Sequence, residues 1–188
     1  MRPNQTVVGF QARKATPDDA DSIAHVHVDT WRTTYKGIVP DERLANLSYE
    51  RSKKMWEDIL SDQKQATFVA EDEDGQVVGF AGCGPARDSE KEYTGELYGI
   101  YVKRSTQGKG LGTMLCREVA RSLRSRALDS MLVWVLAENP FRRFYERLGG
   151  RRVREKEVVI GGKALTEWAY GWKSLDFLVE ESKAPDGS

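Results

Sequence analysis

The chain has 188 residues, of which 39% are hydrophobic, 31% charged and 10% aromatic, as expected for one soluble globular domain. Its 29 basic residues balance 29 acidic ones, so the net charge gives no reason to expect a nucleic-acid or membrane partner. Its two cysteines, Cys83 and Cys116, are too few for a disulfide framework or a cysteine-based zinc site. No segment approaches the ~18 consecutive apolar residues of a transmembrane helix. Residues 1–5 lack the apolar stretch of a signal peptide, so we expect a cytoplasmic protein.

The amino-terminal third predicts one strand followed by helices. Thr16 can cap a helix, Pro17 suits its first turn, and Asp19 completes a T-x-x-D capping pattern. Apolar and aromatic residues then recur at helical spacing up to Tyr35, which indicates one buried helix face. The elements predicted here are a strand over residues 9–13, a long helix that begins near Thr16, and shorter helices over residues 42–47 and 49–61.

The rest of the chain predicts a sheet whose strands are separated by one long and one short helix. The predicted strands cover residues 66–70, 76–83, 92–102, 131–137, 152–160 and 164–173. One helix follows a glycine-rich loop and runs to about residue 128, and a second extends from Asn139 to Leu148. Residues 9–173 are therefore predicted to form a single α+β domain with a mixed sheet, and residues 174–188 a C-terminal tail.

The glycine-rich loop lies between a predicted strand and the long helix, which is a common arrangement for binding a phosphate. Glycines let the backbone approach an anion closely, and the free amides at a helix start supply donors and a partial positive charge. A dinucleotide-binding fingerprint fails because Thr113 stands where its third glycine is required, and no Walker loop occurs. The pattern that remains is Gln107-x-x-Gly110-x-Gly112.

This string resembles the coenzyme A loop, Gln/Arg-x-x-Gly-x-Gly/Ala, of the GNAT superfamily of N-acetyltransferases. The surrounding order is also similar to that of the family: a hydrophobic strand, the loop, a long helix, a buried strand, Asn139, and Tyr145 on a following helix. The resemblance covers residues 9–173. It implies the GNAT fold, a mixed and mostly antiparallel central sheet with flanking helices, and acetyl-CoA as co-substrate without a metal.

The resemblance also assigns residues to the cofactor. In the family, acetyl-CoA lies where two adjacent strands separate, and strand backbone pairs with its pantetheine arm. By this resemblance Asn139 would hydrogen-bond the pantetheine, although its position before Pro140 also suits a helix cap. The residues implied to bind the cofactor are Ile100, Tyr101 and Val102 on the strand, Gln107, Gly108, Lys109, Gly110, Leu111 and Gly112 in the loop, and Asn139.

Acetyl transfer to an amine requires a base for the ammonium proton and benefits from an acid at the leaving sulfur. The resemblance makes Tyr145 the acid. It makes Glu96 a candidate base, acting directly or through water, and a surface carboxylate is the alternative interpretation. Family members that act on protein N-termini often carry a glutamate five residues before the asparagine, where this chain has Trp134.

The acceptor site is less well marked. Aromatic rings can enclose an amine by cation–π contact and a carboxylate can pair with it, although aromatic residues at these spacings also suit a core. The candidates on the first helix and the last hairpin are Trp31, Tyr35, Glu167 and Trp168. We interpret His27, which lies on the apolar helix face, as a packing residue rather than a base.

These features predict an N-acetyltransferase that moves an acetyl group from acetyl-CoA to a primary amine, in the first instance that of a small molecule, by direct transfer in a ternary complex. A protein N-terminal or lysine acetyltransferase is an alternative. A non-catalytic coenzyme A-binding regulatory module is another, favoured by Trp134 and disfavoured by Glu96 and Tyr145. The resemblance is compatible with a homodimer.

Overall fold

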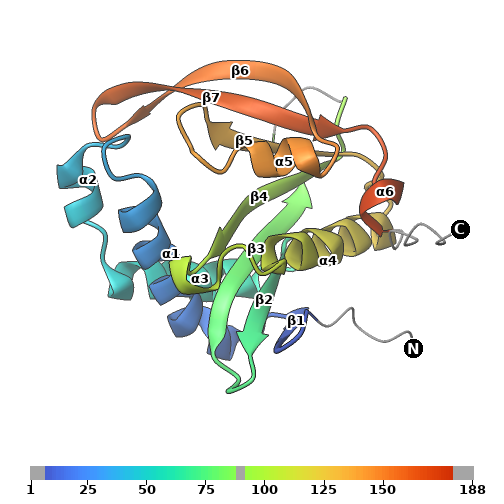
Figure 1. The fold of residues 1–188 in the computed structure, drawn as a ribbon, viewed down its shortest axis with the longest axis horizontal. Coiled ribbons are helices and arrows are strands. Elements are labelled where there is room, and N and C mark those ends of the chain that lie inside the picture. Colours follow the sequence, from blue (N-terminus) through green and yellow to red (C-terminus); the bar gives the residue numbers. More distant parts are fainter. Residues whose placement is uncertain (1–6, 88–91, 180–188) are drawn as a thin grey trace, which may run out of the picture.

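The computed structural model describes residues 7–87 and 92–179, which form one seven-stranded sheet flanked by helices (Figure 1). The strands are β1 (Phe10–Lys14), β2 (Ala66–Asp72), β3 (Val77–Pro85), β4 (Gly95–Val102), β5 (Met131–Leu136), β6 (Arg151–Ile160) and β7 (Lys163–Trp172). The helices are α1 (Ala20–Thr34), α2 (Asp41–Ala45), α3 (Tyr49–Ser61), α4 (Leu111–Ser125), α5 (Arg143–Arg147) and α6 (Asp176–Val179), with 3-10 turns at Pro17–Asp19 and Arg104–Thr106.

The strand order is β1-β2-β3-β4-β5-β7-β6. Every neighbouring pair is antiparallel except β4 and β5, which run parallel. This topology confirms the predicted α+β fold with a mixed and mostly antiparallel sheet. The two parallel strands pair only at their starts, where Gly95 lies opposite Met131 and Glu96 opposite Leu132.

Helices cover both faces of the sheet, and each face has its own hydrophobic core. On one face α4 buries Leu115 and Val119 against the strands. On the other face α1 and α3 pack Ile23 and Trp56 against Phe80 of β3. A third and smaller cluster forms where α2 lies beside the turn of the β6–β7 hairpin (Figure 1). Burial of these apolar side chains is the main favourable contribution to folding.

Strand β4 contains a β-bulge that decides which of its side chains reach the site. Its pairing with β3 shifts between Leu97 and Gly99, so Tyr98 is an extra residue in the ladder. Leu97 and Ile100 consequently both pack in the core on the α4 face, whereas Tyr101 packs on the α1 face. Regular alternation would have placed Leu97 and Ile100 on opposite faces.

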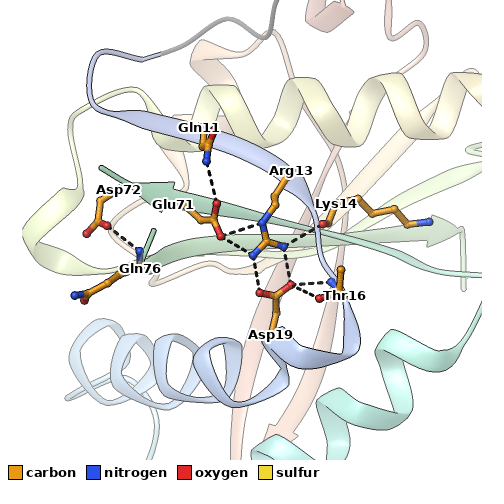
Figure 2. Close-up of polar contacts among 8 residues, drawn as sticks. All are labelled: Gln11, Arg13, Lys14, Thr16, Asp19, Glu71, Asp72 and Gln76. Carbon is orange, nitrogen blue, oxygen red and sulfur yellow. Dashed lines mark hydrogen bonds and ion pairs between the residues drawn. The ribbon is translucent and has the colours of Figure 1, made fainter. Parts of the chain in front are cut away.

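A cluster of charged groups joins β1, β2 and the start of α1 (Figure 2). The Arg13 guanidinium donates to both oxygens of Asp19, at 2.7 and 2.8 Å, and its Nε donates to Glu71 at 2.9 Å. Both carboxylates are only 7% exposed. Asp19 also accepts hydrogen bonds from the backbone N and hydroxyl of Thr16, so the capping pattern expected from the sequence forms. The Arg13 hydrogen bond is the main cause that lowers the pKa of Asp19.

The C-terminal segment differs from the predicted tail. Leu175, just before α6, and Leu178, within it, are 1% and 3% exposed because they pack in the core on the α4 face. Asp176 also forms an ion pair with Arg124 of α4 at 3.0 Å. The remainder of the predicted tail, residues 180–188, lies outside the described residues. Among the helices in the described ranges, none has the length and apolar character needed to cross a membrane.

Candidate active site

A cavity of about 440 Å³ lies between the end of β4, the start of α4 and the α5 region. The end of α1 and Tyr35 close one side of it. Nine of the predicted cofactor-binding residues line it: Ile100, Tyr101, Val102, Gln107, Gly108, Gly110, Leu111, Gly112 and Asn139. Lys109 is not part of this lining, and its Nζ lies 5.5 Å from the centre of the Phe10 ring. The structure therefore brings the loop, the strand and Asn139 together around one cavity.

The glycine loop presents the first turn of α4 to this cavity. Gly108 and Gly110 have φ values of +76° and +87°, which L side chains rarely adopt, so glycine suits both positions. The Gln107 side chain donates to the Val102 carbonyl at 3.0 Å and ties the loop to the end of β4. Amides in the first turn of a helix have no partner within the helix. Such a wall is suited to binding the oxygens of a phosphate.

Tyr145 of α5 also lines this cavity and is 8% exposed. Its ring packs against those of Phe144, Tyr170 and Trp172, with centroids 5.3, 5.8 and 6.4 Å away. Burial raises the pKa of Tyr145 well above its ordinary value, and the neighbouring Cys116 thiol adds to the effect. The hydroxyl thus stays protonated at neutral pH and can donate a proton or a hydrogen bond.

Asn139 has two roles visible in its side-chain contacts. Its Oδ1 accepts a hydrogen bond from the Phe141 backbone N at 2.8 Å, which orders the turn before α5. Its Nδ2 donates to the Tyr35 hydroxyl at 3.3 Å on the cavity wall. Burial is the main cause that raises the pKa of Tyr35, and the bond from Asn139 acts in the opposite direction. The side chain is therefore held in position where the cavity passes between α1 and α5.

A second cavity, of about 490 Å³, lies on the face of the sheet away from α4. Trp134, for example, lies between Val133 and Val135, which both pack in the core on the α4 face, so its ring points the other way. The lining residues are Arg87, Glu96, Tyr98, Trp134, Lys156 and Glu167. Glu167 contributes to the raised pKa of Tyr35 and Tyr101, which line the first cavity. Glu167 also lies opposite Leu136 in the β5–β7 pairing, and Tyr35 packs against the cluster that contains Leu136, so the two cavities adjoin near Tyr35.

Glu96 lines the second cavity and is 2% exposed. Its Oε1 accepts from Nε and Nη2 of Arg87 at 3.2 and 2.5 Å, and its Oε2 accepts from the Arg87 backbone N at 2.9 Å. The Arg87 guanidinium also lies 4.4 Å from the centre of the Tyr98 ring. Glu96 and Tyr145, predicted to share the proton transfers, thus line adjoining cavities rather than the same one.

The four predicted acceptor residues do not form one group. Tyr35 lines the first cavity and Glu167 the second, whereas Trp31 and Trp168 line neither. The Trp31 Nε1 donates to the Tyr101 hydroxyl at 3.3 Å. Glu167 and Trp168 are neighbours in β7, and adjacent strand residues point to opposite faces. By this alternation only one of these two candidates can face a given acceptor site.

His27 is a packing residue, as predicted, and the two cysteines are buried as well. His27 is surrounded by aromatic rings, among them Trp56 and Phe80, with centroids 5.8 and 6.2 Å away. Burial lowers the pKa of His27 to about 4, so it is neutral at physiological pH. Cys83 and Cys116 are both buried, and burial raises their pKa to about 11 and about 12. These thiols are poor nucleophiles.

Arg87 and Lys156 are not among the site residues predicted from the sequence. For Lys156 a signal existed, because residues counted outward from a turn at Gly161 and Gly162 place it opposite Glu167, and the structure shows this pair. Arg87 gives no such signal, because it follows β3 in a loop whose path the local sequence does not determine.

Comparisons with known proteins identify the family and the fold. Residues 25–150 match the model of the Acetyltransferase (GNAT) family. An uncharacterized N-acetyltransferase of Bacillus subtilis, YuaI, is 40% identical over 166 residues, which cover 88% of this chain and 94% of the relative. The structure of PaiA N-acetyltransferase from Thermoplasma acidophilum, determined with coenzyme A, has a TM-score of 0.67 at 20% identity and covers 84% of this chain and 97% of its own.

YncA of Salmonella typhimurium, determined with acetyl-CoA, has a TM-score of 0.68 at 22% identity and covers 96% of this chain and 99% of its own. The two structural matches support the fold, and the sequence matches support the activity. Because the family model spans more than half of the chain and the Bacillus relative matches almost all of it, the chain belongs to the GNAT family and is an acetyl-CoA-dependent N-acetyltransferase.

Proposed function

We propose that this enzyme transfers the acetyl group of acetyl-CoA directly to the primary amine of a small molecule, within a ternary complex. The observation that carries the proposal is the pair of adjoining cavities where β4 and β5 separate. One cavity contains the glycine loop and Tyr145, and the other contains carboxylates and aromatic rings. Donor and acceptor would occupy separate cavities and meet where these adjoin.

Acetyl-CoA would occupy the first cavity. The pyrophosphate would bind the loop backbone and the first turn of α4, where amide donors and the helix dipole favour an anion. The pantetheine arm would pair with the backbone of Ile100 and Val102, because β4 is not paired with β5 beyond Glu96. Asn139 would then hydrogen-bond the arm from the α5 side.

The transfer forms a C–N bond between the amine and the thioester carbonyl carbon, and it breaks the C–S bond. The ammonium gives up one proton before attack and a second after it, and the sulfur takes up one, so one proton is released overall. Tyr145 is the proposed donor to sulfur, because its hydroxyl stays protonated and lines the donor cavity. Glu96 is the proposed proton acceptor, acting through water because both of its oxygens already accept hydrogen bonds from Arg87.

The second cavity favours a small acceptor over a polypeptide. Its volume falls within the roughly 300–1,000 Å³ typical of small-molecule sites. The rings of Tyr98 and Trp134 form apolar walls, and charged groups complete the lining. Such a lining provides both shape and a few directional polar contacts.

The proposed function can be tested by following thiol release from acetyl-CoA with polyamines, amino acids, aminoglycosides, arylamines and short peptides as acceptors. We expect turnover with one class of small amine and none with peptides. Turnover with peptides alone would replace the small-molecule acceptor by a protein. Acetyl-CoA binding measured by calorimetry, without transfer to any of these amines, would contradict the proposed acceptor class.

A further inference from the structure

The lining of the second cavity has an unusual charge arrangement. It contains two ion pairs, and the cation of each pair lies over an aromatic ring of the same lining. Arg87 pairs with Glu96 at 2.5 Å and lies over Tyr98 at 4.4 Å. The Lys156 Nζ lies 3.5 Å from the Glu167 carboxylate and 3.9 Å from the centre of the Trp134 ring. Two positive and two negative side chains give this cavity no net charge.

A neutral but strongly polar cavity discriminates between classes of amine. A polyamine or other simple cation would bring an unbalanced positive charge into a partly desolvated site, which is unfavourable. A ligand with one positive and one negative group keeps the total at zero and can pair each of its ends. The balance of side chains is therefore complementary to a zwitterion.

We infer that the acceptor is a small zwitterion with a primary amine and a carboxylate, as in an amino acid, and that its carboxylate binds Arg87 and Lys156 while its amine binds Glu167. This inference rests on the proposed acetyl transfer and names the acceptor class of the same site. It assigns to Lys156 the recognition of the acceptor's acid group.

The exposure of the two cations supports this orientation. The side chain of Arg87 is 64% exposed although that of its partner Glu96 is 2% exposed, so the guanidinium extends from the carboxylate toward the open side of the cavity. A guanidinium carries five N–H donors, and Glu96 engages two of its side-chain nitrogens. Lys156 is 46% exposed, and its ammonium has three donors. Both cations can thus receive a second carboxylate.

Glu167 is placed to hold the amine near the donor. It pairs with Lys156 on the adjacent strand, and it lies opposite Leu136, whose cluster packs against Tyr35 of the first cavity. An amine at Glu167 would therefore lie on the side of the acceptor cavity that faces the acetyl group. The carboxylate end of the ligand would lie at Arg87 and Lys156, whose side chains are 64% and 46% exposed.

The test compares kcat/KM for a set of amino acids and for the matching amino-acid amides, with putrescine as a simple diamine. The amide keeps the amine and side chain but removes the negative charge. Rates are compared at equal concentrations of neutral amine, because the amide group lowers the pKa of the neighbouring amine. We expect at least about tenfold higher kcat/KM for the best amino acid than for its amide, since hydrogen bonds between charged groups are among the strongest.

The variant Lys156→Gln should raise the KM for that amino acid by about tenfold or more and leave the KM for its amide nearly unchanged. Lys156→Arg should restore much of the preference, because it keeps the charge. Lys53→Gln is a matched control. Lys53 lies on α3, its side chain is also 46% exposed, and its Nζ also lies 3.5 Å from a carboxylate, that of Asp21. We expect this control to behave as the wild type.

Two outcomes would overturn the inference. If putrescine or the amides are used as well as the amino acids, or if Lys156→Gln affects amide and amino acid equally, the zwitterion assignment is wrong and the proposed acetyl transfer stands. If no amine is acetylated although acetyl-CoA binds, the proposed function fails and the inference fails with it.

Discussion

At the scale of single residues, the Tyr145 hydroxyl is the group whose role can be isolated most cleanly. We expect Tyr145→Phe to lower kcat by at least about tenfold, since a positioned acid typically contributes a factor of ~10²–10⁴. The KM for acetyl-CoA should change little, because the phenyl ring keeps the packing against Phe144 and Tyr170. Steady-state kinetics with a saturating acceptor would measure both. Equal kcat in the two proteins would remove Tyr145 from the mechanism.

A substitution at Gly112 tests separately whether acetyl-CoA binds in the first cavity. A Cβ atom at this position would lie 3.0 Å from the Phe144 ring, and the methyl groups of a valine would extend into the cavity. Gly112→Val should therefore lose measurable acetyl-CoA binding in calorimetry while its thermal unfolding stays near that of the wild type. Ser125→Val, at the exposed end of the same helix, is the control and should bind normally. Normal binding by Gly112→Val would place acetyl-CoA elsewhere.

The residues predicted from the sequence that line the first cavity belong to short contiguous segments. The loop from Gln107 to Gly112 and the segment from Asn139 to Tyr145 are each recognised from a few neighbouring residues. Their assignment therefore does not depend on how the rest of the chain folds. The residues of the second cavity, by contrast, come from distant parts of the chain. Its charges come from β4, β6, β7 and the loop after β3, and only the sheet register brings them together.

At the scale of elements, Arg13 connects β1, β2 and the start of α1 through two nearly buried carboxylates. Arg13→Met would leave Asp19 and Glu71 without this partner. We expect a loss of about 2–3 kcal/mol in the free energy of unfolding, less than for a fully buried pair because the Arg13 side chain is 38% exposed. Urea unfolding at neutral pH would measure it. A loss no greater than that of a surface pair would show that the cluster is not a structural anchor.

The matched control for this experiment is Arg121→Met. Arg121 is 37% exposed and pairs with Glu118 one turn away on α4, so it has similar exposure but joins no separate elements. Pairs of this kind contribute about 0.3–0.5 kcal/mol.

The same cluster predicts a dependence of stability on pH. The pKa of Asp19 is lowered in the folded protein from an ordinary value of 3.8, chiefly by its hydrogen bond with Arg13. Its contribution is therefore fully present above that value and is lost as the pH falls through the lower folded pKa. The difference in unfolding free energy between wild type and Arg13→Met should shrink below pH ~4. A difference that stays constant from pH 7 to pH 3 would contradict this account.

Local sequence patterns predicted the types of the helices and strands well, but they did not predict where these elements begin and end. The helix predicted over residues 49–61 matches α3, because Ser48 caps its start and Arg51 donates to that cap. The helix predicted from Asn139 begins only at Arg143, because the Asn139 side chain caps a turn that precedes it. The α6 helix was absent from the prediction, since four residues give no periodicity and their packing on α4 is a long-range effect.

At the scale of the whole molecule, the proposed donor and acceptor sites are two separate cavities, so neither substrate would have to leave before the other binds. We expect sequential kinetics, with double-reciprocal plots that intersect when both substrates are varied. Parallel lines would indicate a covalent acetyl-enzyme instead. Such an intermediate on cysteine is disfavoured because Cys83 and Cys116 are buried. Mass spectrometry of the enzyme mixed with acetyl-CoA alone should detect no added acetyl group on either residue.

The extra residue in β4 determines to which face of the sheet each later side chain of this strand points. Removing Tyr98 would take one ring from the second cavity and would exchange the faces of Ile100 and Tyr101, which both line the first. On the opposing strand β3, Gly84 leaves room for Tyr98, since a Cβ at Gly84 would lie 2.5 Å from the Tyr98 hydroxyl. Substitutions in β4 act one at a time, whereas a one-residue deletion acts on every side chain beyond it. Among related chains, the length of this strand should therefore vary less than its composition.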